Sequence, residues 1–290
     1  MKNRKSISLL TAIIAVLSLI AAVCGIIPGQ GPGYEYKSIH GQIISIYGKG
    51  LYQNDSSAVA IQAIGQDAVT ILFGIPLLIV SLYFARKGHI KGRLLLTGAL
   101  GYFLYTYASY SFLSMYNPLF LVYVALMSLS LFAFVLSIIS FDMENLHLYF
   151  SGRLPVKVIG GFLISIACLL GLMWLKAILT PLLRGAAPEA LEHYTTLTIQ
   201  ALDLAFVVPT AILSGILLIR KKSFGYLLAT VMTVKETALL AAITSMIIAQ
   251  AISGVHIEPV QVLLFLLFDM VIAACLVLIM RNIKEPRRID

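Results

Sequence analysis

Long apolar runs recur along this chain, and they constrain its fold more than any other feature of the sequence. Each run holds roughly 18 to 25 residues, enough to cross a hydrocarbon layer of about 30 Å as a helix. The chain is 60% hydrophobic and 12% charged, against about 25% charged for an ordinary soluble domain. The sequence therefore predicts an all-α, polytopic integral membrane bundle of eight transmembrane helices, near residues 7–27, 66–85, 94–114, 118–140, 156–179, 197–219, 224–251 and 260–280.

The formal net charge is +8, and the placement of the charges argues against nucleic acid as a partner. Basic residues gather in the breaks on alternate sides, such as Arg86-Lys87 after the second run and Arg220-Lys221-Lys222 after the sixth. The positive-inside rule then places both termini in the cytoplasm, which eight crossings satisfy. We expect a multi-pass protein with one transmembrane domain over residues 1–290. Membrane lipid surrounds it, and anionic headgroups are a lesser alternative role for the basic clusters.

Residues 1–27 begin like a signal peptide, but their apolar stretch exceeds the usual length of about 7 to 15 residues. We expect them to be retained as the first helix; cleavage would leave seven helices. The three cysteines all lie inside apolar runs, so no disulfide framework is expected. All five histidines fall in predicted loops, which argues against a haem, and Glu189 with His193 supplies too few ligands for a metal site. The sequence thus predicts no cofactor and no metal.

The one long external loop, residues 28–64, is predicted to form a cap between the first two helices. Two partly alternating stretches, 34–39 and 42–47, flank a break that ends in Gly41, which is typical of a β-hairpin. Open sheet edges are not tolerated in lipid, so this hairpin would lie over the membrane. Residues 54–57 can cap a helix, and residues 57–64 are apolar enough to lie at the interface.

Ionisable residues lie in the middle of three apolar runs. Lys235 and Glu236 are central in the run from Phe224 to Ile252, and Asp203 and Asp269 lie in the sixth and eighth runs. Such residues are costly in hydrocarbon and face the protein interior with partners. Counting about 1.5 Å per residue from the cytoplasmic ends puts Lys235 and Asp269 at similar depth, so they could pair near the midplane, with Asp203 about two turns further out.

Deep tyrosines and a further aspartate extend this polar set. Tyr102 and Tyr105 on the third run are too deep for an interfacial aromatic belt. They either bond another helix or line a polar cavity. Asp67 lies near the outer end of the second run, where it is either a solvated or capping carboxylate or part of a site. Pro76 is expected to kink that helix.

The second and third runs resemble the sixth and seventh, which suggests an internal duplication. Aligning Pro76 with Pro209 also superposes Tyr102 on Lys235 without a gap. Both halves would run in the same direction, as in a parallel four-plus-four repeat of the kind some transporters use. Chance similarity between leucine-rich helices is the competing explanation.

Four stretches of the chain carry a resemblance to other proteins. They are Tyr47-Gly48-Lys49-Gly50-Leu51-Tyr52-Gln53-Asn54-Asp55, Gln66-Asp67, Tyr105-Thr106-Tyr107-Ala108-Ser109-Tyr110 and Tyr116-Asn117-Pro118-Leu119-Phe120. The chain is similar to a group of prokaryotic multi-pass membrane proteins to which no activity is assigned. The resemblance implies a place in the cell membrane of a prokaryote. It implies no activity and no site residue.

Four functions remain open on these observations. Lys235 with Asp203 or Asp269 could be a buried pair that fixes helix registry. A carboxylate and the lysine could act on a lipid-borne substrate, but no nucleophile elbow or paired histidine supports an enzyme. We favour a protein that binds or transports a small solute or ion, coupled to protons, through a polar intramembrane cavity. The alternative is a non-transporting protein that binds a partner or ligand through its external loop. The residues predicted for the cavity are Tyr102, Tyr105, Asp203, Lys235, Glu236 and Asp269, with Asp67 as a further candidate.

Overall fold

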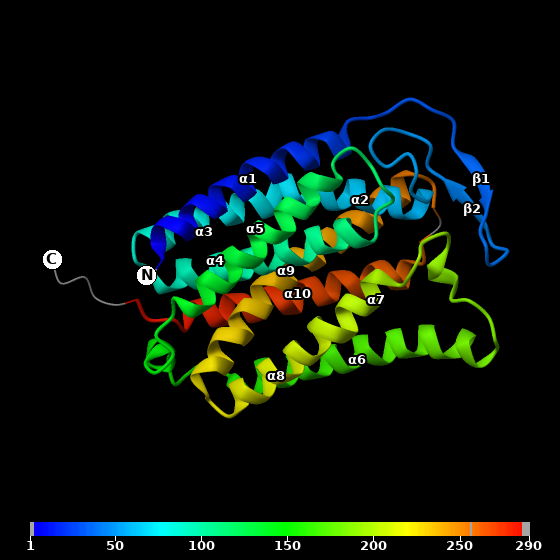
Figure 1. The fold of residues 1–290 in the computed structure, drawn as a ribbon. Helices are drawn as coiled ribbons and strands as arrows, with labels where there is room; N and C mark the ends of the chain where they lie inside the picture. Colours follow the sequence, from blue (N-terminus) through cyan, green and yellow to red (C-terminus); the bar gives the residue numbers. More distant parts are fainter. Residues whose placement is uncertain (1–2, 256, 286–290) are drawn as a thin grey trace.

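The computed structural model describes residues 3–255 and 257–285, and the chain is helical apart from its loops and one small sheet. The long helices lie side by side along a common direction, with loops at both ends of the bundle (Figure 1). The α-helices are α1 (Arg4–Ile26), α2 (Ser57–Val69), α3 (Ile75–Arg86), α4 (Ile90–Phe112), α5 (Phe120–Ile139), α6 (Val156–Leu183), α7 (Thr198–Leu202), α8 (Val208–Ile219), α9 (Ser223–Ile252) and α10 (Pro259–Arg281). Two short 3₁₀ helices, η2 (Leu146–Tyr149) and η3 (Glu189–Leu191), lie in the loops.

Seven helical segments of the described chain are long and apolar enough to cross a membrane. They are α1, α2 through α3, α5, α6, α7 through α8, α9, and Val262–Arg281 of α10. This supports a multi-pass helical membrane protein, but the predicted count of eight spanning helices is not confirmed. The remaining predicted span is α4, which is 23 residues long and mostly buried. It packs against α3, α5 and α9, so its polar side chains face protein rather than lipid.

Two of the long segments change their helical pitch in the same way. The segment η1 (Thr70–Gly74) joins α2 to α3, and η4 (Asp203–Val207) joins α7 to α8; both are π-helical. Each leads into a helix with proline near its start, Pro76 and Pro209. Proline lacks an N–H and its ring crowds the carbonyl four residues back, so a wider turn relieves the clash. The kink predicted at Pro76 therefore takes the form of a π turn.

The external loop forms the predicted hairpin at the end of the bundle opposite the start of α1 (Figure 1). Strand β1 (Tyr34–Lys37) pairs antiparallel with β2 (Ile43–Ile46). Helix α2 begins at Ser57, so residues 57–64, expected at the membrane interface, continue directly into the rest of that helix. The Ser56 side chain caps that helix by accepting a hydrogen bond from the backbone N–H of Val59, at 3.2 Å.

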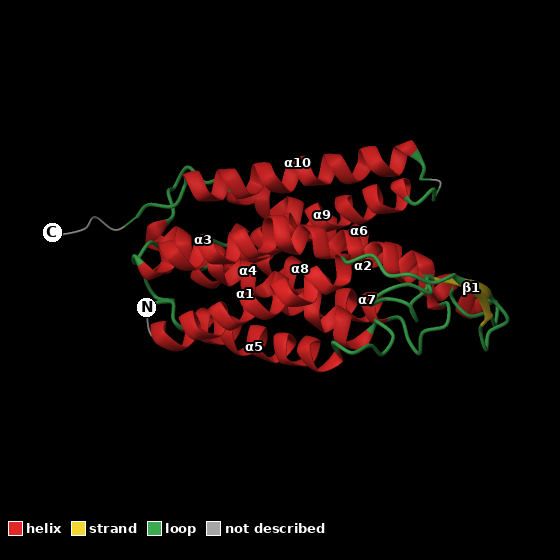
Figure 2. Cartoon of the chain, turned by 90° about the horizontal axis from the view of Figure 1, so that it is seen from above, coloured by secondary structure: helices red, strands yellow, loops and turns green. Residues whose placement is uncertain are grey.

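The helices α4 and α9 form the centre of the bundle. The long helix α9 packs against α2, α4, α8 and α10, and α10 lies along the outer edge in the second view (Figure 2). Gly98 allows α4 to approach α9 closely, since a Cβ there would lie 2.4 Å from the Cβ of Val234. At its N-terminal end α4 is capped by the Glu285 carboxylate, which accepts hydrogen bonds from the backbone N–H groups of Ile90 and Lys91 at 2.8 and 3.0 Å.

Candidate functional site

Asp203 is the anchor of a polar group between three helices. It is the first residue of η4 and is only 6% exposed. The Tyr105 hydroxyl, from α4, donates to its Oδ1 at 2.7 Å, and the Trp174 indole N–H, from α6, donates to its Oδ2 at 2.9 Å. Two donors on one buried carboxylate fix its orientation. We name Trp174, Asp203, Tyr105, Lys235 and Glu236 together the Asp203 network.

The lysine of this network lies on the other side of Tyr105. Lys235 is 5% exposed, and its Nζ lies 4.2 Å from the centre of the Tyr105 ring. The same Nζ is 2.9 Å from Oε1 of Glu236, the next residue in the chain. One tyrosine thus contacts a carboxylate through its hydroxyl and an ammonium through its ring face. The sequence prediction that these charges share a polar interior holds for Asp203, Lys235 and Glu236.

The partner predicted for Lys235 was wrong. Its ion pair is with Glu236 and not with Asp203 or Asp269. Asp269 is only partly buried and accepts a short hydrogen bond from the Thr244 hydroxyl on α9. Thr244 follows Lys235 by nine residues, about 13 Å along a helix. Asp269 therefore lies outside the Asp203 network.

Asp67 and Tyr102 belong to a second buried polar group, between α2 and α4. Asp67 is 1% exposed, which excludes the solvated interpretation. Its carboxylate accepts hydrogen bonds from Tyr52 of the external loop at 2.6 Å and from Tyr110 of α4 at 3.0 Å. Gly25 of α1 lies so close that a Cβ there would be 1.8 Å from Asp67 Oδ2. Asp67 is thus covered by the cap above and by α1 beside it.

Tyr102 continues this second group towards the middle of the bundle. Its hydroxyl accepts a short hydrogen bond from the Gln66 side-chain amide, and it lies 3.4 Å from the Thr70 hydroxyl of η1. Tyr102 is fully buried. Of the two alternatives for the deep tyrosines, bonding to another helix is therefore the one observed, for Tyr102 and for Tyr105 alike.

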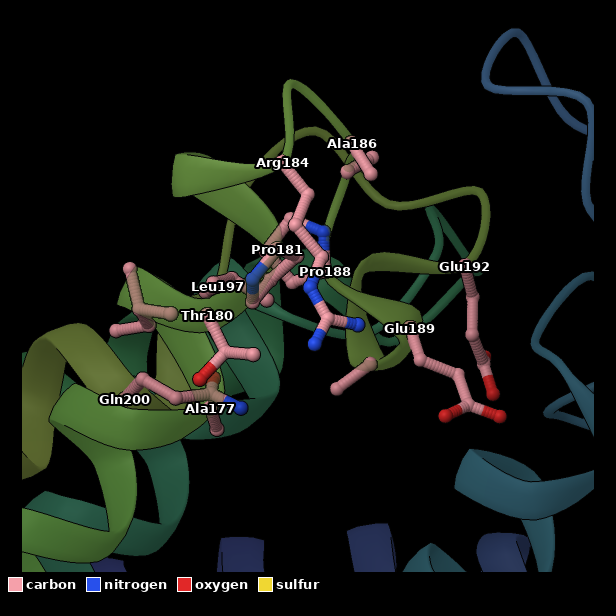
Figure 3. Close-up of a pocket in the computed structure, with 13 residues that line it drawn as sticks. Ala177, Thr180, Pro181, Arg184, Ala186, Pro188, Glu189, Glu192, Leu197 and Gln200 are labelled. Atoms are coloured by element: carbon pink, nitrogen blue, oxygen red, sulfur yellow. The ribbon is translucent and has the colours of Figure 1, made fainter.

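An open cavity lies where α6 ends and α7 begins, with a volume of about 600 Å³. Figure 3 shows the Arg184 guanidinium between Thr180 and Gln200 on one side and Glu189 and Glu192 on the other. The cavity is lined by Ala177, Ile178, Thr180, Pro181, Arg184, Ala186, Ala187, Pro188, Glu189, Ala190, Glu192, Leu197 and Gln200.

This cavity adjoins the Asp203 network. Ala177 follows Trp174 by one turn of α6, and Gln200 precedes Asp203 by one turn of α7, so each pair shares a helix face. Gln200 is 8% exposed. The cavity therefore lies about one helical turn from the Trp174–Asp203 hydrogen bond.

A third carboxylate, Asp55, links three loop segments at the end of the bundle that carries the hairpin. It lies just before α2 and is 1% exposed. Its Oδ1 accepts hydrogen bonds from the Met115 backbone N–H at 2.8 Å and from the Tyr194 hydroxyl at 3.0 Å. Its Oδ2 is buried and has no hydrogen-bond partner among the described residues. Burial, the largest cause, and the nearby negative charge of Glu192 outweigh these hydrogen bonds and raise the pKa of Asp55 to about 6 from its ordinary 3.8.

This raised pKa predicts that the end of the bundle that carries the hairpin is more stable in mild acid. Between pH 4 and 6 the folded protein holds a proton on Asp55 that the unfolded chain has lost, so stability falls as the pH rises through 6. The loss between pH 5 and 7.5 is about 1 kcal/mol. Asp55→Asn keeps an oxygen for Met115 and Tyr194 but removes the charge. Its thermal unfolding in detergent should therefore lack this component of the pH dependence. An unchanged pH dependence in the variant would contradict the assignment.

Trp174, Tyr52 and Asp55 were not predicted as site residues. Trp174 lies five residues before the end of its predicted run at 179, a position typical of an interfacial anchor, whereas α6 continues to Leu183 and places Trp174 about 13 Å from its end. The sequence signal that could have identified Trp174 as a site residue is its depth within the run, together with its being the only tryptophan of the chain. Tyr52 carried no such signal, because its role depends on the cap folding back over α2. Among the described residues, no group of three or more His, Cys, Asp or Glu side chains is placed to hold a metal.

The chain was compared with protein-family models, with curated proteins and with solved structures. None of the three comparisons finds a match. The resemblance to prokaryotic multi-pass membrane proteins therefore stays a prediction from the sequence, and functional inference depends on the geometry described above.

Proposed function

We propose that this protein binds and passes a small solute or ion, coupled to protons, through a polar path that includes the Asp203 network. The observation that carries the proposal is the chain of contacts from Trp174 through Asp203 and Tyr105 to the Lys235–Glu236 pair. Ionisable residues buried among membrane-spanning helices are costly, and they commonly mark ion pathways and proton relays. The external cavity gives this path a mouth.

In this proposal Asp203 is the group that changes state. It lies in a π-helical segment next to a proline, and such irregular turns occur frequently at functional sites. Water that reaches the cavity floor can exchange a proton with Asp203 once the Trp174 indole moves aside. Tyr105 then separates Asp203 from the Lys235–Glu236 pair, so a change of charge on one side alters the field at the other.

We further propose that α4 is the eighth spanning helix and that the chain is a parallel repeat of two four-helix halves. A shift of 133 residues carries η1 onto η4, α3 onto α8, and the start of α4 onto the start of α9. The same shift carries Thr70 to Asp203 and Tyr102 to Lys235. The equivalent helices α4 and α9 pack against each other, as expected beside a two-fold axis. With both termini cytoplasmic in a cell membrane, the cap and the cavity face outside.

Purified protein in proteoliposomes tests the function. With an imposed potential and an internal pH dye, we expect proton entry above that of empty liposomes, and Asp203→Asn should reduce it at least tenfold because the amide cannot ionise. Tyr105→Phe, which keeps the ring below Lys235 but loses the hydroxyl, should reduce it less.

Two variants serve as controls for this flux. Asp269→Asn removes an intramembrane carboxylate outside the network, and Asp142→Asn removes an exposed one that bonds Asn145; both should keep the wild-type flux. Wild-type liposomes that pass neither protons nor Na⁺, or an Asp203→Asn variant with unchanged flux, would contradict the proposal. Either result would favour a non-transporting protein that binds a partner through its cap.

A further inference from the structure

A basic groove lies at the end of the bundle where α1 begins and α3 ends. Its volume is about 380 Å³, and it is lined by Arg4, Ile79, Leu82, Tyr83, Arg86 and Lys87. The two helices pack against each other, and both belong to segments apolar enough to cross a membrane. The groove is therefore on the outer flank of the bundle, near the level where a hydrocarbon layer would end.

The side chains of this groove divide into a charged rim and an apolar wall. Arg4 and Arg86 are exposed, and neither forms an ion pair within the described residues. The Nζ of Lys87 lies 4.3 Å from the centre of the Tyr83 ring. Below the rim, Ile79 and Tyr83 are each about half exposed, at 52% and 53%. Three cations thus converge from two helices over a surface suited to hydrocarbon.

We propose that this groove binds an anionic phospholipid. Its phosphate lies between Arg4, Arg86 and Lys87, and one acyl chain follows Ile79 and Leu82 along α3. An anionic headgroup suits a site with three positive charges better than a zwitterionic one, whose own cation would be repelled. The apolar wall distinguishes a lipid from free phosphate, since an inorganic ion would leave that wall exposed. Basic pockets between membrane-spanning helices are known to hold such headgroups.

The proposal is independent of transport and needs only that the helices span a membrane. Its test uses purified, delipidated protein and measures bound phosphatidylglycerol and phosphatidylcholine by native mass spectrometry. The wild type should bind phosphatidylglycerol in preference. Arg4→Gln with Arg86→Gln should weaken that binding roughly 25-fold, since each basic residue near an anionic surface contributes about fivefold in affinity.

A matched control removes the same charge from the same end of the bundle. Arg220→Gln with Lys221→Gln, in the turn between α8 and α9, should leave the binding unchanged. A second variant, Ile79→Trp, keeps every cation but fills the groove at a half-exposed position where folding tolerates it, and should also weaken binding.

Four results would overturn the proposal. The first is an equal loss in the groove variant and in the control, which would mean general attraction between charges. The second is equal binding of the two lipids, and the third is an Ile79→Trp variant that binds like the wild type. The fourth is displacement of the lipid by millimolar inorganic phosphate, which would reassign the groove to the free ion.

Discussion

Lys235→Met is expected to lower the free energy of unfolding by about 3 kcal/mol, because it leaves the partly buried carboxylate of Glu236 without its partner. The ammonium is held by Glu236 Oε1 at 2.9 Å and by the face of Tyr105, and the substitution removes both contacts. Unfolding by SDS in mixed micelles measures the effect, and Trp174, the only tryptophan, supplies the fluorescence signal inside the same network.

The double variant Lys235→Met with Glu236→Gln separates a lost charge partner from lost packing. It removes both charges and should recover most of the stability, since replacing a whole buried pair is often nearly neutral. Lys176→Met, at an exposed position of α6, controls for the loss of a lysine as such and should change the free energy of unfolding little. If the double variant loses as much free energy of unfolding as the two single variants together, the pair does not act as a unit.

Gly160→Ala should destabilise the protein by about 1 to 3 kcal/mol, the usual cost of forcing extra atoms into a packed interface. A Cβ on Gly160 of α6 would lie 2.7 Å from the carbonyl oxygen of Gly215 on α8, and one on Gly215 would lie 2.5 Å from that of Gly160. The two backbones therefore touch at this crossing, as small residues allow between membrane helices. The same SDS titration measures the loss.

The neighbouring glycine provides the control for this interface. A Cβ on Gly161 would meet nothing within 4 Å, so Gly161→Ala should be neutral or stabilise by up to about 1 kcal/mol through better helix propensity. If the two alanines have the same effect, close contact between α6 and α8 is not what requires Gly160. Trp174 lies on α6, and Asp203 lies in η4, which leads directly into α8. Loosening the crossing of α6 and α8 should therefore also weaken the Trp174–Asp203 hydrogen bond.

The features predicted well from the sequence are those set by local chemistry. The length of an apolar run determines where a spanning helix lies, and Gly41 with its flanking strands determines the hairpin. The cap predicted within residues 54–57 is Ser56, whose side chain bonds the backbone N–H of Val59 three residues on. Each of these needs only neighbours within a few residues, so a single sequence contains the information.

The pairing of the buried charges could not be predicted in the same way. Depth was counted from helix ends on the assumption that the ends of α9 and α10 are level. The hydrogen bond between Thr244 and Asp269 requires an offset of about 13 Å. The rotation of each helix about its axis is equally unconstrained by periodicity, because α4 is buried on several sides and its tyrosines bond different neighbours, Gln66 of α2 and Asp203 of η4. Asp67 seemed close to water only because the fold of the cap over it was unknown.

The π-helical segment at Asp203–Val207 has a consequence for insertions and deletions. A π turn holds an extra residue relative to the α-helical turn it replaces, so deleting Ala205 would let the backbone relax to ordinary α-helical winding without breaking the helix. Because the wider turn takes up the extra residue, the helices on either side would keep nearly the same rotation about their common axis. The change would be confined to the turn, where Asp203 would present its carboxylate differently to Trp174 and Tyr105, so one missing residue could disrupt the site while the fold survives.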